Sequence, residues 1–146
     1  MRKLVLAVSM LAFAGTAAMA DPIAQRQEIM KANGKALKSI AAIAKGEQPF
    51  DAELVLAALK TLNEDAQKFD VAALFPQGSE TGGDTTASPK IWEDMAGFQK
   101  AVDKFKADTE AAVAAAPADL DAFKAEFGKV AQNCGSCHET FRIKKG

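Results

Sequence analysis

The chain has 146 residues and a formal net charge of −1, with charged residues making up 25% of the sequence. This length supports one hydrophobic core, and the sequence has no basic stripe of the kind that binds nucleic acid. Two Cys and one His are the only residues of these types, so a zinc site of Cys and His ligands would be short of donors.

Residues 1–20 have the organisation of a secretory signal peptide. Arg2 and Lys3 form its positively charged start, residues 4–13 are apolar, and Ala18-Met19-Ala20 is a cleavage site that would make Asp21 the first mature residue. An uncleaved anchor is the alternative, although the apolar run is short for a membrane span. We therefore expect one exported domain over residues 21–146, located in the periplasm and without a membrane span of its own.

Two amphipathic helices are expected in the first half of that domain. The first covers residues 22–45, with Asp21 as N-cap and Gly46 as its stop. The second covers residues 51–69, with Asp51 as N-cap. Apolar residues recur in both at the three- and four-residue steps of a buried helix face: Ile29, Met30, Leu37, Ile40, Ala41 and Ala44, then Leu54, Val55, Ala58, Leu59, Leu62, Ala66 and Phe69.

A loop over residues 76–88, rich in Gly, Ser, Thr and Asp, leads to two further helices. The third covers residues 89–115, with an apolar stripe of Trp92, Met95, Phe98, Val102 and Phe105, and Pro117 ends it. The fourth begins after Asp119, and its apolar seam is Leu120, Phe123, Phe127, Val130, Cys134, Cys137 and Phe141. Four helices with three connections predict an all-α fold, an antiparallel four-helix bundle.

The fourth helix contains the motif Cys134-Gly135-Ser136-Cys137-His138. C-x-x-C-H is the attachment signature of a c-type haem. Two thiols add to the haem vinyl groups, and the His supplies a neutral imidazole to the iron. On a helix these three side chains share one face, which would place the haem inside the bundle. A redox dithiol, half of a zinc site and a simple disulfide are the alternatives.

With these features the chain resembles the class II cytochromes c, the group of cytochrome c′ and its low-spin relatives, and it looks closest to the low-spin, Met-ligated members. The resemblance covers essentially all of the mature chain. It is carried by residues 134–142 and 26–34, and by the shorter segments 46–51, 74–76 and 88–92. It implies a four-helix bundle with one covalent, internal haem c.

The resemblance also implies roles for three residues outside the motif. Met30 would face the iron opposite His138 and supply its sixth ligand, as in the low-spin members; in five-coordinate members the matching residue is apolar and does not bind. Arg26 would approach a haem propionate, and Arg142 would lie one turn beyond His138. From spacing alone, core packing is the better interpretation of Met30, and a solvated helix charge is the usual state of an Arg.

We expect a one-electron carrier rather than an enzyme, because the sequence offers no second His and no nucleophile–base pair. The alternative is a five-coordinate haem protein that binds nitric oxide or carbon monoxide. A peroxidase would need a distal acid–base group. The expected partners are periplasmic redox proteins or, for the alternative, small gases, and either a monomer or a homodimer is compatible with the helix faces.

Overall fold

The computed structural model describes residues 21–144. The predicted signal peptide, residues 1–20, lies outside the described residues. The helices described below therefore belong to the expected exported domain.

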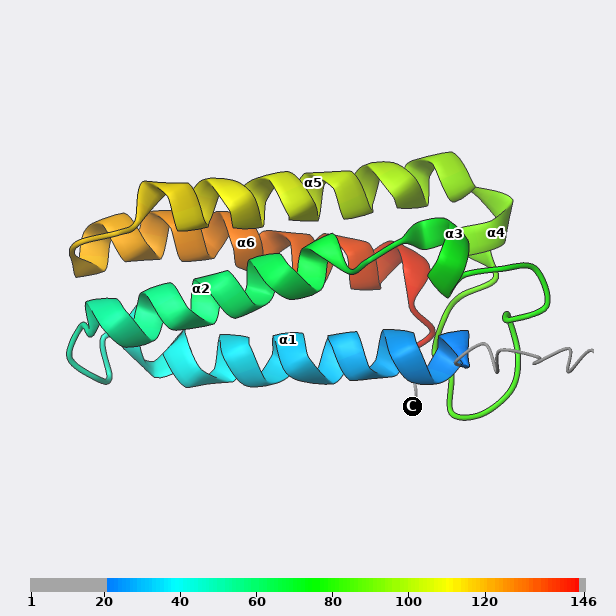
Figure 1. The fold of residues 1–146 in the computed structure, drawn as a ribbon, viewed down its shortest axis with the longest axis horizontal. Helices are drawn as coiled ribbons and strands as arrows, with labels where there is room; N and C mark the ends of the chain where they lie inside the picture. The colour runs from blue at the N-terminus through cyan, green and yellow to red at the C-terminus, as the bar shows by residue number, and fades with distance from the viewer. Residues whose placement is uncertain (1–20, 145–146) are drawn as a thin grey trace, which may run out of the picture.

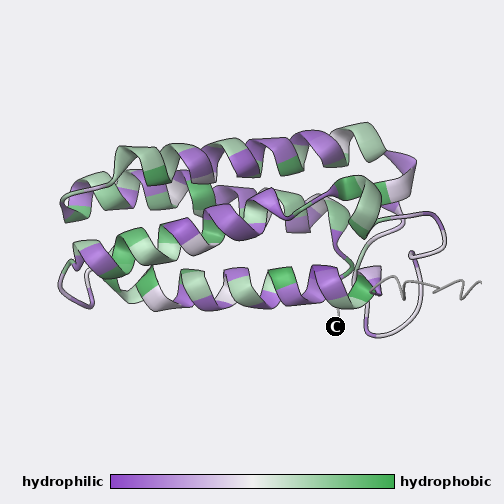
Figure 2. Cartoon of the chain, in the orientation of Figure 1, coloured by the Kyte–Doolittle hydropathy of each residue, from purple (hydrophilic) through white to green (hydrophobic). Residues whose placement is uncertain are grey.

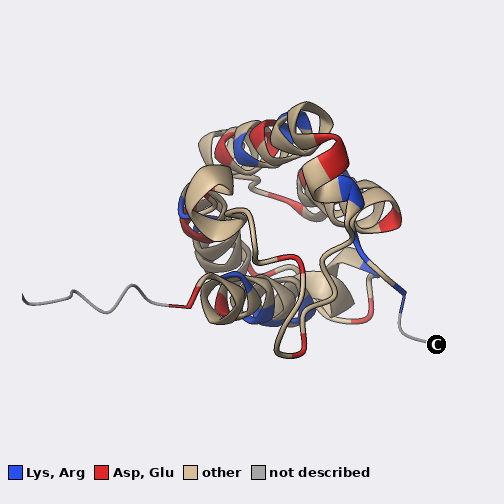
Figure 3. Cartoon of the chain, turned by 90° about the vertical axis from the view of Figure 1, so that its right-hand side faces the viewer, with Lys and Arg blue, Asp and Glu red and all other residues tan. Residues whose placement is uncertain are grey.

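Four long helices form an antiparallel bundle: α1 (Pro22–Ala44), α2 (Ala52–Gln67), α5 (Met95–Ala115) and α6 (Leu120–Phe141). They are joined in a ring, because α1 contacts α2 and α6, and α5 contacts the same two helices. Figure 3, which looks along the bundle, shows this ring with charged residues mainly on its outside. The predicted all-α four-helix bundle is confirmed.

Each long helix begins at an aspartate whose side chain accepts a hydrogen bond from the first turn. The bonds run from Ile23 N to Asp21 and from Ala122 N to Asp119, both 2.9 Å, with similar bonds at Asp51 and Asp94. Such a cap contributes about 1 kcal/mol to helix stability. The caps predicted at Asp21, Asp51 and Asp119 are confirmed. Gly46, with φ 76°, follows the end of α1 in a left-handed conformation that glycine adopts without strain.

The prediction of one continuous helix over residues 89–115 was wrong. The chain forms a short helix, α4 (Lys90–Glu93), and then breaks at Asp94, which has φ −132° and ψ 61°. Asp94 instead caps α5 through Gly97 N at 2.9 Å. A Cβ on Gly97 would clash with the Asp94 carboxylate, so in this geometry the cap leaves no room for a larger residue at position 97.

The second predicted helix also ends earlier than expected. Helix α2 stops at Gln67, Phe69 lies in the following link, and an unpredicted short helix, α3 (Val71–Leu74), begins with Asp70 as its cap. Leu54 was predicted on the buried face of α2, but it is 39% exposed. Helices α3 and α4 lie at the same end of the bundle, together with the loop that connects them (Figure 1).

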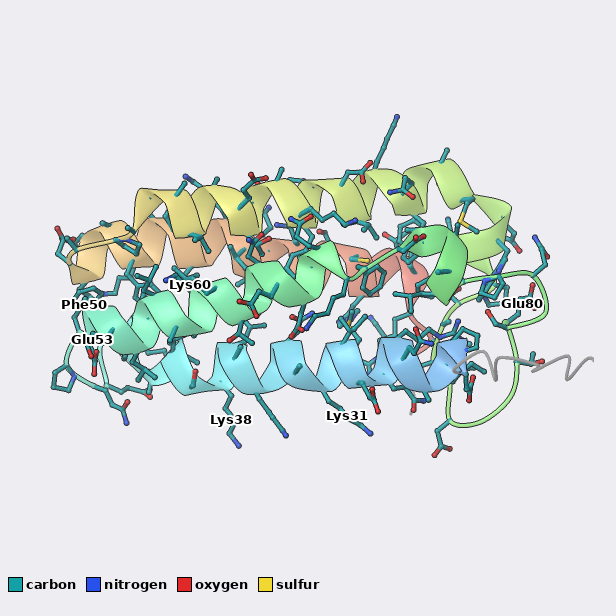
Figure 4. The ribbon with its side chains drawn as sticks, in the orientation of Figure 1. Lys31, Lys38, Phe50, Glu53, Lys60 and Glu80 are labelled. Atoms are coloured by element: carbon teal, nitrogen blue, oxygen red, sulfur yellow. The ribbon has the colours of Figure 1, made fainter. Side chains whose placement is uncertain are left out.

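The core has two parts along the bundle axis. Hydrophobic and hydrophilic residues alternate along the long helices (Figure 2), and Lys31 and Lys38 project outward from α1 (Figure 4). One buried cluster is mostly aliphatic and has a single buried aromatic side chain. It includes Ile40, Ile43, Val55, Leu59, Leu62, Phe123 and Val130. The other is aromatic, and includes Phe69, Phe75, Ile91, Phe98 and Phe141. No described helix is both long and apolar enough to cross a membrane.

Candidate cofactor site

The three residues of the sequence motif lie in the last two turns of α6. Cys134 and Cys137 are half-buried, and both thiols are free. The thiol of Cys134 approaches the Val130 carbonyl oxygen at 3.9 Å. Asn133, just before the motif, donates to Asp108 Oδ2 at 2.6 Å and to Lys129 O at 2.9 Å. The bond to Asp108 joins α6 to α5 beside the first cysteine.

Two adjacent cavities lie along this segment, with volumes of about 360 Å³ and about 140 Å³. They share four lining residues, Met30, Phe69, Cys137 and His138. The larger has an aromatic wall of Phe75, Phe98 and Phe141 and a polar end of Arg26, Thr85, Thr86 and Arg142. The smaller is lined by Asn33, Leu37, Val102, Phe105, Asn133 and Cys134, among others. Together they form a largely apolar space that both cysteines reach.

Met30 reaches this space from α1, which is adjacent to α6, the helix that carries His138. Its side chain is not packed in the core, since the residue is 38% exposed. It lines both cavities, as does His138. Met30 therefore lines a cavity instead of lying in the buried core, and the fold brings Met30 and His138 to the same space.

Arg26 is buried, with 5% of its surface exposed, so it is not a solvated helix charge. Its two terminal nitrogens donate to Leu74 O, Ser79 Oγ, Ser79 O and Thr85 Oγ1 at 2.7–3.1 Å. Burial lowers the pKa of Arg26, and the charges of Asp21 and Glu80 partly offset that effect. No described carboxylate forms an ion pair with it. The site therefore contains a buried cation without a direct counter-ion.

Arg142 lies at the same polar end of the larger cavity as Arg26. Its Nε donates to Thr86 Oγ1 at 3.3 Å, and the backbone nearby pairs with the long loop through Ile143 N to Thr86 O at 2.8 Å. Arg142 itself is exposed. It lies close enough to His138 to act on its charge: partial desolvation of the ring, and then the positive charge of Arg142, lower the pKa of His138 below 6.5. The imidazole is therefore neutral at neutral pH, the form that binds metals.

The cysteines are not activated nucleophiles. Burial raises the pKa of Cys134, and burial together with the neighbouring Cys134 raises the pKa of Cys137 to about 11. Redox-active C-x-x-C pairs have the opposite property, a lowered thiol pKa. The described residues also contain no cluster of three or more His, Cys, Asp or Glu that could hold a metal ion. The raised thiol pKa values disfavour the redox-dithiol alternative.

Several residues of this site were not found by sequence reasoning. Thr85 and Thr86 come from the long loop, whose composition gives no sign of which residues turn inward. Asn33 lies one helical turn after Met30, and that spacing could have identified it.

The sequence of the chain is similar to those of known proteins. A family model described as Cytochrome C′ matches residues 21–142. The chain is 47% identical to a cytochrome c′ of Rhodopseudomonas palustris, over 88% of this chain and 86% of the relative. It is 39% identical to a cytochrome c-556 of Agrobacterium tumefaciens, over 86% of this chain and 100% of the relative.

Solved structures agree with the sequence comparisons. The structure of cytochrome c′ from Rhodopseudomonas palustris superposes with a TM-score of 0.80 at 46% identity, covering 87% of this chain and 99% of that one. A structural model of oxidised cytochrome c556 from the same organism gives a TM-score of 0.73 at 36% identity, covering 86% and 98%.

Proposed function

The chain belongs to the cytochrome c′ family of haem proteins, and from that premise we propose that it is a periplasmic one-electron carrier in which Met30 and His138 bind the iron of one covalent haem c. The observation that supports this proposal most directly is that these two side chains line the same cavities from the neighbouring helices α1 and α6. No other imidazole is available, since His138 is the only His in the chain.

The residues present fit a haem. A haem needs an apolar space for its ring, two thiols beside that space, and positive charge for its two carboxylates. The two cavities have aromatic and aliphatic walls, both cysteines reach them, and Arg26 and Arg142 lie at one end. Arg26 is buried without a direct counter-ion, and a carboxylate would supply one.

Each residue then has a defined task. Cys134 and Cys137 would form the two thioether bonds, His138 would supply a nitrogen ligand, and Met30 a sulfur ligand. The bound haem supplies an iron that gains or loses one electron. Ligation by His and Met would raise the reduction potential relative to other ligand sets. An iron that keeps the same two protein ligands in both oxidation states would have little to rearrange when its charge changes. The surrounding Phe side chains provide an apolar wall.

The periplasm is the proposed location because residues 1–20 have the pattern of a signal peptide. The proposed partners are redox proteins of the same compartment. A carrier of this size would meet them transiently, guided by local charge rather than by its small net charge.

A second candidate function is binding of nitric oxide or carbon monoxide at a five-coordinate iron. The 47% identity to a protein named cytochrome c′ supports it, because the five-coordinate members of the family carry that name. The relatives do not decide between the two, since some are named cytochrome c′ and others cytochrome c-556.

Absorption spectra of the purified protein in both oxidation states test the proposal. We expect low-spin spectra in both, with reversible one-electron oxidation, and a haem that stays attached on denaturation. A high-spin spectrum with rapid carbon monoxide binding would favour the gas-binding function.

A further inference from the structure

Asn33 is a buried polar residue beside the cofactor site. It lies in α1 one turn after Met30 and is 6% exposed. Its Oδ1 is buried and has no hydrogen-bond partner among the described residues. The side chain lines the smaller cavity together with Met30 and Cys134.

An orphaned amide in this place costs stability, because buried polar groups are normally hydrogen-bonded. Leu37, one turn further along α1, lines the same cavity with an apolar side chain. A leucine at position 33 would avoid the cost. The amide is therefore best explained by a hydrogen bond that forms when the cavity is filled.

The helix geometry limits what that bond can reach. Residues at positions i and i+3 share a helix face, and side chains lean toward the N-terminus of their helix. The amide of Asn33 thus leans over the turn that carries Met30. Its last torsion is two-fold, so that either its oxygen or its NH₂ group can occupy the buried position. A thioether sulfur accepts hydrogen bonds but cannot donate them.

Three other polar or titratable side chains line this cavity: Asn133, Cys134 and His138, the proposed nitrogen ligand. Asn133 lines the same cavity, but its Nδ2 donates to Asp108 and Lys129. Cys134 would have no S–H left to donate once it forms its thioether bond.

We propose that Asn33 is a positioning residue: its NH₂ group donates a hydrogen bond to the thioether of Met30 and holds the sulfur against the haem iron. This inference rests on the proposed ligation by Met30.

The test is a double-mutant cycle on the haem-loaded protein with the variants Asn33→Leu, Met30→Leu and both together. The readouts are the spin state and the rate at which the reduced protein captures carbon monoxide, which requires the sulfur to leave. Loss of one hydrogen bond should speed capture roughly three- to tenfold in Asn33→Leu. In the Met30→Leu background the same change at Asn33 should have no further effect.

The matched control is Asn63→Leu in α2. Asn63 Oδ1 accepts from Gln67 and Thr109 at 3.3 Å and lies outside both cavities, so its replacement should leave the capture rate unchanged. If Asn33→Leu does not fold, as judged by thermal melting, Asn33→Ala replaces it in the cycle.

Two results would overturn the inference while leaving Met30 as a ligand: an unchanged rate in Asn33→Leu, or an equal acceleration in both backgrounds. A high-spin wild-type protein would overturn ligation by Met30 and this inference together. That outcome is seen in the wild-type spectrum alone, so the two failures are distinguishable.

Discussion

The guanidinium carbon of Arg26 lies 4.8 Å from the centre of the Phe75 ring. The two residues are far apart in sequence, and the contact joins the first turns of α1 to the start of the long loop. The same guanidinium donates to Ser79 and Thr85. Arg26 therefore holds the loop over one end of the cofactor site, in addition to any contact with a haem carboxylate.

Replacing Arg26 by Met should destabilise the protein. The change keeps much of the side-chain length but leaves the carbonyls of Leu74 and Ser79 without donors, which should cost about 2–3 kcal/mol. Urea unfolding measures the loss. Arg142→Met is the control, because Arg142 is exposed and should cost about 0.5 kcal/mol or less. Equal effects of the two substitutions would contradict this role of Arg26.

Replacing Cys134 and Cys137 by Ala should abolish covalent attachment of the haem. These are the only two thiols in the chain, so no other residue can form the thioether bonds. Mass spectrometry of the denatured protein should show one attached haem in the wild type and none in the double variant. Isolation of the native wild type as a haem-free protein with a Cys134–Cys137 disulfide would refute the attachment.

His138→Ala should remove a ligand without unfolding the helix that carries it. His138 as a whole is exposed and lies in a helix with good packing at Phe141 and Val130. We expect a changed haem spectrum together with nearly unchanged helical content by circular dichroism. A spectrum that still reports a nitrogen ligand would mean that His138 is not the ligand.

Acid should weaken the tie between α5 and α6. Burial alone would raise the pKa of Asp108, but hydrogen bonds from Asn133 and Lys104 outweigh it and hold the pKa below 3.8. The folded state then binds fewer protons than the unfolded state, so this contribution is complete above about pH 4 and is lost as the pH falls further. Asp108→Asn should lose less stability than the wild type between pH 5 and pH 3, as measured by urea unfolding.

The control for that experiment is Asp103→Asn on the same helix. Asp103 is exposed and accepts a hydrogen bond only from Gln99. Its replacement should leave the acid sensitivity of the wild type in place. If both variants behaved alike, the effect would not come from the contact between Asp108 and Asn133.

The bundle could be predicted because its signals are local. Three-residue and four-residue apolar steps and aspartate caps are read directly from neighbouring residues. The break at Asp94 could not be predicted from such signals, because Trp92, Met95 and Phe98 keep helical spacing across it. The pattern records which residues are apolar, while the break depends on an aspartate that turns its side chain to cap the next helix.

The residues of the site likewise fall into two groups: those that the local sequence predicts and those that it does not. Cys134, Cys137 and His138 are contiguous, so their shared face follows from helix geometry. Met30 was found only through family resemblance, because spacing alone favoured core packing. The contacts of Arg26 with Ser79 and Thr85 join segments about fifty residues apart, and no local pattern encodes a pairing of that kind.

The identity of the sixth iron ligand decides between electron carrier and gas binder, and Met30 is the residue that tests it. If the thioether is bound, the reduced protein should be low-spin and should resist carbon monoxide until the sulfur leaves. Met30→Ala should then open that position, lower the reduction potential and speed gas binding, because a sulfur ligand favours the reduced iron. The measurements are a redox titration and stopped-flow mixing with carbon monoxide.

A substitution of similar size separates ligation from cavity effects. Met30→Leu keeps most of the apolar volume and removes the sulfur, so a ligand role predicts that Leu and Ala variants both become high-spin. A packing role predicts that Leu behaves as the wild type and that only Ala, which leaves a cavity, changes the protein. A wild type that is already high-spin, with a spectrum of the same type in both variants, would assign the open iron to gas binding. Electron transfer would then be the secondary property of the site.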